Sequence, residues 1–301
     1  MPVKTSYSLF VTISVILWGS VYPTVKHLII EGVPPFTIVY LRILFSLLIA
    51  AALMWAGGER PRLQELKNNF GPLLALALFG VIFFQGFMAI GMQNTQAGKS
   101  TLINSLNPAM IVILAHFVLK ESLSLRQIIG VIVSLGGVIL CVIGDPNFNI
   151  QSLSFMAGDL MFVGTALCWT IYTILSRRYG SRISFQATLF WMYLLAFLLT
   201  LPLSIFSFNQ VALISPAQWF YVIYLGILPG GLCFYAWNRG LAVIGATTCG
   251  MINSLLPISA IAISTLWLRE QLSALQLVGG VLVILGVWQG IQKGKQEGFH
   301  G

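Results

Sequence analysis

The sequence predicts an all-α polytopic membrane protein of ten transmembrane helices, arranged as a 5+5 inverted-topology repeat with both termini in the cytoplasm. Three observations lead to this prediction: a composition with too few charges for a soluble surface, a succession of apolar segments of membrane-spanning length, and an internal repeat.

The composition excludes an ordinary soluble domain. Of the 301 residues, 57% are hydrophobic and only 8% are charged, and the mean hydropathy is +0.90. Soluble domains carry roughly 25% charged residues, so most of this surface must face lipid. The net charge is +8, but no basic run with interleaved aromatic residues indicates a nucleic-acid partner.

Ten apolar segments follow one another with short connections. Each approaches the roughly 20 residues that a spanning helix needs, and continuous apolarity favours helices over alternating barrel strands. We expect helices over residues 8–30, 34–56, 71–95, 98–119, 124–143, 154–177, 184–208, 216–240, 246–268 and 272–291. With a cytoplasmic N-terminus, 12 of the 16 Lys and Arg residues fall on the inside, as the positive-inside rule requires.

The second half repeats the first after a shift of 149 residues. Segments 97–138 and 246–287 share 14 identities in 42 gapless positions. The identities include Asn, Pro, Glu and Gln positions, which shared hydrophobicity alone would not align. Because each half holds five helices, an odd number, the halves enter the membrane in opposite orientations, a device of secondary transporters.

The repeated motif Asn-Ser-Leu-x-Pro is the strongest candidate for a site. It runs from Asn104 to Pro108 and again from Asn253 to Pro257, near the middle of the fourth and ninth spans. Proline frees the carbonyl four residues earlier and kinks the helix, so we expect Pro108 and Pro257 to be gating kinks. A packing kink is the alternative.

Further candidates lie in other spans. Aromatic side chains with a few polar groups are typical of small-molecule cavities, and intramembrane charges are functional candidates. We expect a substrate site formed by Trp18, Tyr22, Gln85, Asn104, Asn107, Trp169, Tyr172, Tyr235 and Asn253. Phe84 and Phe234 belong to the same aromatic set, although an interfacial belt is the alternative for such residues.

Two charged residues, Arg42 and Asp159, lie inside the second and sixth spans on the side expected to face outward. They could pair with each other, or Arg42 could attract an anionic group such as a carboxylate, or both could reach the interface by snorkelling. Glu121 and Glu270 are expected to cap the helix that follows each of them. The Gly226–Gly230 and Gly286–Gly290 pairs indicate close helix packing within the chain rather than dimerisation.

In the order and repetition of its motifs the sequence resembles the two EamA domains of the drug/metabolite transporter superfamily. The resemblance rests on Leu17-Trp18-Gly19, Pro35-Phe36 and Arg42, the segment Asn104 to Pro108, Leu119-Lys120-Glu121, and their counterparts Trp237-Asn238-Arg239, Pro257 and Leu268-Arg269-Glu270. It implies EamA-like repeats over residues 8–143 and 154–291, with a central cavity between helices 1, 3, 4, 6, 8 and 9. It also implies export of amino acids, other metabolites or drugs.

The leading hypothesis is a secondary exporter that works by alternating access in a bacterial inner membrane, without cofactor or bound metal. Its partners are a small-molecule substrate, the lipid bilayer and an unidentified coupling ion, and the chain is a monomer or weak dimer. A nucleotide-sugar or phosphate-ester exchanger of the same fold is the nearest alternative. An intramembrane enzyme would need a nucleophile and base or metal ligands, and a channel would need pore-lining rings; neither pattern stands out.

Overall fold

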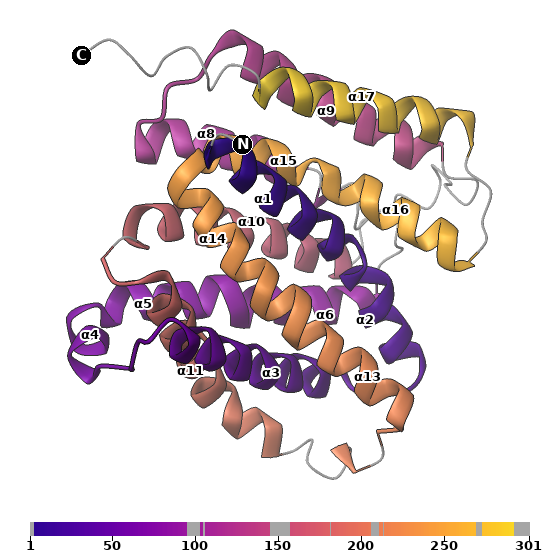
Figure 1. Ribbon diagram of the computed structural model, residues 1–301. Coiled ribbons are helices and arrows are strands. Elements are labelled where there is room, and N and C mark those ends of the chain that lie inside the picture. Colours follow the sequence, from indigo (N-terminus) through magenta and orange to yellow (C-terminus); the bar gives the residue numbers. More distant parts are fainter. Residues whose placement is uncertain are drawn as a thin grey trace, which may run out of the picture.

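The computed structural model describes residues 3–94, 103–104, 106–144, 157–180, 182–205, 211–212, 214–268 and 273–291. Within them the chain forms helices and turns without any strand, and the helices lie roughly along a common direction (Figure 1). Nine helices there are long and apolar enough to cross a membrane, and Asn107–Leu119 is a shorter apolar helix. These helices match the ten expected apolar segments and confirm the all-helical fold class.

The described part of the first repeat supplies four helices of membrane-spanning length, two of them interrupted, and the shorter α8. Its helices are α1 (Val3–Gly19) and α2 (Val21–Ile30), α3 (Pro35–Ala56), the short peripheral α4 (Leu63–Asn68), then α5 (Phe70–Ala77), the π-helical turn η1 (Leu78–Phe83) and α6 (Phe84–Asn94), α8 (Asn107–Leu119), and α9 (Leu125–Ile143). Helices α1 and α2 together make the first span, and α5 to α6 the third.

The second repeat follows the same plan. Its helices are α10 (Ala157–Tyr179), α11 (Phe185–Ile205), α13 (Pro216–Leu225), the π-helical turn η3 (Gly226–Leu232) and α14 (Cys233–Ile244), α15 (Ala246–Asn253) and α16 (Leu255–Leu268), and α17 (Ala274–Ile291). The turn η3 sits where η1 sits in the first repeat, since residues 78–83 shifted by 149 become residues 227–232. π-Turns inside helices are frequent at functional sites.

The last helices of the two repeats pack directly against each other, as Figure 1 shows for α9 and α17. A Cβ atom on Gly130 would lie 2.6 Å from the carbonyl oxygen of Gly286, and one on Gly137 would lie 2.6 Å from that of Gly279. The repeat shift relates Gly130 to Gly279 and Gly137 to Gly286, so the two contacts are equivalent. The partners also run in opposite order, which makes the equivalent helices antiparallel and the repeats inverted.

The motif prolines lie next to true breaks rather than smooth kinks. Pro108 is the second residue of α8, and Leu106 just before that helix is a turn residue. In the second repeat α15 ends at Asn253, and α16 starts at Leu255 after a turn at Ser254. The break therefore precedes each proline, which is where proline is tolerated in a helix.

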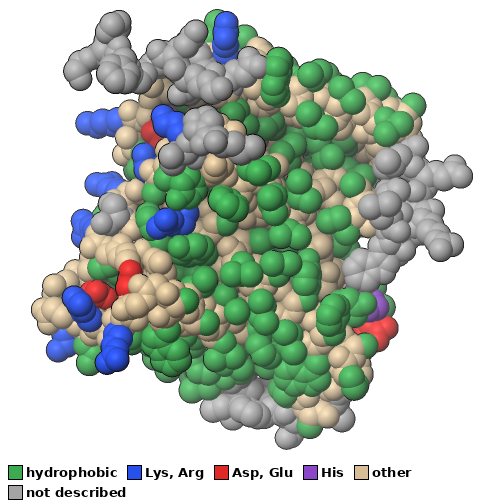
Figure 2. All heavy atoms as spheres, viewed as in Figure 1, with side chains coloured by type: hydrophobic (Ala, Val, Ile, Leu, Met, Phe, Trp, Pro, Cys, Tyr) green, Lys and Arg blue, Asp and Glu red, His purple; other side chains and the backbone are tan. Residues whose placement is uncertain are grey.

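The outer surface has the character of a lipid-facing protein. Figure 2 shows hydrophobic side chains over the middle of the visible face and Lys and Arg gathered along one edge, where α4 lies in Figure 1. Large apolar side chains such as Phe117 and Trp288 are more than half exposed. The lipid chains of a bilayer solvate such an apolar surface favourably, whereas water does not.

The expectation for Glu121 is wrong, because this residue caps a helix of the other repeat. The helix that follows it, α9, begins with a capping box made by Ser124 and Gln127. The Glu121 carboxylate instead accepts hydrogen bonds from the backbone N–H groups of Ala246 and Thr247, at 3.0 and 2.9 Å. The first N–H groups of a helix have no partner within it, so Glu121 closes the start of α15. Glu270 lies outside the described residues.

The glycine pairs pack within the chain, as expected. Gly226 faces Phe45 and Gly230 faces Ser46, both on α3, and a Cβ at either position would collide there. The hydroxyl of Ser46 donates to the carbonyl oxygen of Gly226 at 3.0 Å. This close approach brings α3, and with it Arg42, against η3.

Candidate functional site

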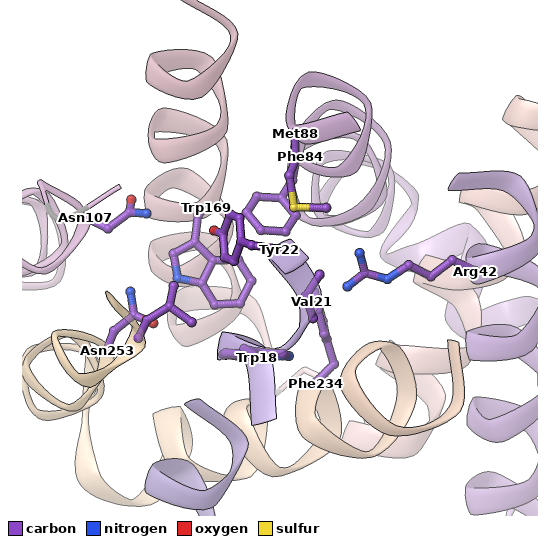
Figure 3. A pocket seen from close by; sticks show the side chains of 11 residues that line it. Trp18, Val21, Tyr22, Arg42, Phe84, Met88, Asn107, Trp169, Phe234 and Asn253 are labelled. Atoms are coloured by element: carbon purple, nitrogen blue, oxygen red, sulfur yellow. The ribbon is translucent and has the colours of Figure 1, made fainter. Parts of the chain in front are cut away.

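A cavity lies between the two repeats, and residues from both repeats line it. The space in it that water-sized spheres can occupy is about 30 Å³. Its walls come from α1, α2, α3, α6, α8, α10, α14, α15 and α16, through Trp18, Val21, Tyr22, Arg42, Phe84, Met88, Asn107, Trp169, Phe234, Asn253 and Leu256 (Figure 3). A site at the interface of inverted repeats, beside broken helices, is where secondary transporters bind their substrates.

Aromatic side chains form the centre of this cavity. The ring centroid of Trp18 lies 5.0 Å from that of Trp169 and 5.6 Å from that of Phe234. The ring of Phe84 lies 5.1 Å from that of Trp169. Edge-to-face contacts of this kind are favourable beyond the area they bury, so the aromatic walls hold one another in place.

The indole N–H groups of Trp18 and Trp169 differ in their hydrogen bonding. Trp18 donates its Nε1–H to the carbonyl oxygen of Pro229 at 2.9 Å, which ties the first span to η3. The Nε1 of Trp169 is buried and has no hydrogen-bond partner among the residues that the structure describes. Because a buried polar group is costly when unsatisfied, this N–H is available to a bound molecule.

Arg42 is a buried cation on the cavity wall. Only 2% of its surface is exposed, and no described residue forms a hydrogen bond with its Nε. This depth rules out snorkelling to the membrane interface as its role. The side chain of Asp159, its suggested partner, lies outside the described residues.

Two amides line the cavity where helices break. Asn253 is the last residue of α15, and Asn107 is the first residue of α8. The side-chain oxygen of Asn107 accepts a hydrogen bond from the Thr170 hydroxyl at 3.3 Å, which fixes its orientation. Figure 3 shows both amides on the side opposite to Arg42, with the aromatic rings between.

The remaining expected site residues lie outside the cavity lining. Asn104 and Gln85 are buried, and neither amide has a hydrogen-bond partner among the described residues. Tyr172 packs on Trp169 and Phe234 and accepts a hydrogen bond from Asn238 at 2.7 Å. The ring of Tyr235 lies under the Arg239 guanidinium instead, 5.8 Å from it. Pro108 and Pro257 flank the breaks without lining the cavity.

Sequence reasoning missed three apolar lining residues, Val21, Met88 and Leu256. Helical spacing from residues that were named could have found them: Val21 is three residues after Trp18, Met88 four after Phe84, and Leu256 three after Asn253. Residues at such spacings share a helix face. The cavity implied by the family resemblance left out the second span, although Arg42 was considered as a residue that attracts an anionic group, and Arg42 on α3 does line the cavity.

An inverted ten-helix architecture with a cavity between its halves defines the class of polytopic membrane transporters. The sequence pattern of the EamA-like transporter family matches residues 5–143 and 156–289. The chain therefore belongs to the EamA-like transporter family, which confirms the resemblance drawn from the motifs.

Relatives and solved structures agree with this assignment. The chain is 26% identical to the uncharacterized transporter YetK of Bacillus subtilis, covering 90% of this chain and 83% of the relative. It is 25% identical to a probable terminal-alkyne amino-acid exporter of Streptantibioticus cattleyicolor, covering 91% and 90% of the two chains. One crystal structure superimposes with a TM-score of 0.76 at 20% identity, covering 95% of this chain and 98% of that chain.

Proposed function

We propose that this protein is a secondary transporter that exports a small metabolite, such as an amino acid or a drug-like compound, by alternating access. One observation carries the proposal: a cavity with aromatic walls, two amides and a buried cation lies between inverted repeats, beside the breaks in the fourth and ninth spans. Rocking of the repeats about these breaks would open the cavity to each side in turn.

Membrane orientation completes the proposal. The basic edge of Figure 2 would face the cytoplasm of a bacterial inner membrane, with both termini on that side, because Lys and Arg collect in cytoplasmic loops. The contact of Glu121 with the start of α15 lies near Arg177, whose Nε is 3.6 Å from the Glu121 carboxylate. In this orientation the contact of Glu121 with α15 would close the cytoplasmic end of the cavity. The two EamA-like repeats would extend over residues 8–143 and 154–291.

The nearest alternative is an exchanger for nucleotide sugars or phosphate esters. Such ligands carry two or more negative charges, and phosphate groups are bound by several basic side chains or by helix N-termini. Arg42 is the one basic residue among the described residues that line the cavity. This charge balance favours a substrate with at most one negative charge.

The proposal is tested by counterflow in proteoliposomes. Purified protein is reconstituted with a trapped unlabelled solute, and uptake of the same labelled solute is followed for amino acids, organic cations and phosphate esters, with and without a proton gradient. Saturable uptake that requires trapped solute supports a carrier. Flux that neither saturates nor requires trapped solute indicates a channel, and chemical conversion of the solute indicates an enzyme.

A matched pair of variants locates the site in the same assay. Asn107→Ala together with Asn253→Ala removes both cavity amides, and we expect the half-saturating concentration to rise about tenfold or more, as loss of about two hydrogen bonds predicts. Gln64→Ala together with Asn68→Ala removes two exposed amides of the peripheral α4. We expect that pair to transport normally. If the half-saturating concentration of the Asn107→Ala, Asn253→Ala variant is unchanged, the substrate site lies elsewhere.

A further inference from the structure

The charge of Arg42 has no counterpart in the part of the chain that the structure describes. The described acidic side chains are Glu31, Glu59, Glu65 and Glu121, and none of them lines the cavity. The ionisable groups that act on the Arg42 guanidinium are three tyrosine hydroxyls and one thiol: Tyr22, Tyr193, Tyr224 and Cys233. All are neutral at physiological pH in their ordinary state, so no described side chain balances the positive charge of Arg42.

Two of these hydroxyls are already committed to other partners. The hydroxyl of Tyr193 donates to the carbonyl oxygen of Gly230, and that of Tyr224 shares a hydrogen bond with Ser20. The hydroxyl of Tyr22 makes no hydrogen bond with any described residue, and Tyr22 lines the cavity together with Arg42. A ligand group placed between them would meet a cation and a free hydroxyl donor.

The rest of the cavity is apolar until the two amides. Trp18, Trp169, Phe84, Phe234 and Met88 present rings and a thioether to the space next to Arg42. Figure 3 shows the Arg42 side chain entering from the side opposite to Asn107 and Asn253. A buried unpaired charge is costly, so the ligand that gains most is one that neutralises Arg42 and covers the aromatic walls.

From this arrangement we propose that the transported species is an amphipathic monoanion, with a carboxylate-like head at Arg42 and an apolar body against the aromatic walls. A zwitterion would neutralise Arg42 but would bury an ammonium group for which no described lining residue offers a carboxylate. A cation would add a second positive charge to the cavity. The inference rests on the proposed function and narrows its substrate class.

This substrate charge also sets the driving force. Each molecule exported carries one net negative charge outward, and the inside-negative membrane potential of a cell favours that movement. Export of a monoanion therefore proceeds down the electrical gradient without a coupling ion. The cavity agrees with this mechanism, since its described lining contains no carboxylate that would carry a proton.

The test uses three probes with one body and different heads. L-Phenyllactate is a monoanion, L-phenylalanine a zwitterion and L-phenylalaninol a monocation, and the three have nearly the same shape. Binding to the purified full-length protein is measured by calorimetry. We expect phenyllactate to bind at least tenfold more tightly than phenylalanine, with phenylalaninol weakest. Tighter binding of either of the other two, or no binding of any, overturns the proposal.

Variants assign the preference to Arg42. Arg42→Gln is expected to lower phenyllactate affinity at least tenfold and to abolish the preference over phenylalanine, and Arg42→Lys to keep part of it. Arg126→Gln removes an exposed cation at the start of α9 and serves as the control with unchanged affinities. If Arg42→Gln does not fold, the three-probe comparison on the unaltered protein still tests the preference for a monoanion.

A flux measurement separates this inference from the proposed function. In proteoliposomes, an inside-positive potassium diffusion potential should increase phenyllactate uptake severalfold and leave phenylalanine uptake unchanged. A phenyllactate uptake rate that does not change with the membrane potential overturns the electrogenic mechanism. Counterflow of phenylalanine or an organic cation without phenyllactate binding would overturn the inference and leave the transporter intact. Absence of counterflow for every class would remove the proposed function itself.

Discussion

Replacing Glu121 by Gln should loosen the start of α15 by about tenfold in its local opening equilibrium. In the structure the Glu121 carboxylate receives three hydrogen bonds: from Ala246 N at 3.0 Å, from Thr247 N at 2.9 Å and from the Thr247 hydroxyl at 2.7 Å. The carboxylate also interacts with the positive end of the helix dipole. Glutamine keeps one acceptor oxygen but loses the charge.

The magnitude follows from these contacts. A hydrogen bond to a charged group contributes about 1.5–3 kcal/mol when buried, and Glu121 is one-fifth exposed, which reduces that figure. Retention of one acceptor reduces it again, so we expect a loss of about 1.5 kcal/mol. A loss of 1.4 kcal/mol corresponds to a factor of about ten in an equilibrium constant.

Hydrogen–deuterium exchange in nanodiscs measures this directly. The amides of Ala246 and Thr247 lie in the first turn of α15, where Glu121 is their acceptor, so the peptide covering residues 243–251 should exchange about tenfold faster in Glu121→Gln. Glu59→Gln is the control, since Glu59 accepts a hydrogen bond from Ser184 near the start of α11. Equal protection of the peptide in Glu121→Gln and the unaltered protein would refute the assignment of Glu121 as the cap.

Two further predictions concern packing and the cavity wall. Gly137→Ala places a Cβ 2.6 Å from the carbonyl oxygen of Gly279, whereas a Cβ on neighbouring Gly136 meets nothing within 4 Å. Overpacking should lower the stability of Gly137→Ala by about 1–3 kcal/mol. Gly136→Ala should be neutral or stabilising. A thermal unfolding scan in detergent checks this, and equal midpoints for the pair would contradict the close packing of α9 and α17. Trp18→Phe keeps the aromatic ring but leaves the Pro229 carbonyl without its indole donor, so unfolding should occur a few degrees lower, for a loss of about 1–3 kcal/mol. An unchanged midpoint would show that the hydrogen bond contributes nothing.

Hydropathy and the repeat predicted most of the architecture because both depend on local sequence. Span length follows directly from bilayer thickness, and the odd number of spans in each half predicts inversion. The target of Glu121 could not be predicted, since its partner lies 125 residues further along the chain, on a helix of the other repeat. Helix-capping rules consider neighbours in sequence, which here favoured the wrong helix.

The site was predictable only in part, because residue type shows polarity but not direction. Asn253 and Asn107 line the cavity, while Asn104 of the same motif is buried away from it. Residue type alone does not separate Met88 and Leu256 from apolar residues that face lipid, and only their spacing from Phe84 and Asn253 pointed to the cavity. The break of the first span after Gly19 also escaped notice; α16 packs closely there, and a Cβ on Gly19 would lie 2.7 Å from the backbone nitrogen of Ala260.

The most direct test of the account is counterflow in a protein whose cavity has been filled. Leu256→Trp places a large side chain in the cavity lining, and Leu285→Trp makes the same change on the outer face of α17, where Leu285 is about half exposed. Both variants are first shown to unfold at the temperature of the unaltered protein. We predict that Leu256→Trp loses counterflow of whichever solute the protein carries, while Leu285→Trp retains it. Full counterflow in both variants would contradict the claim that substrate passes through this cavity.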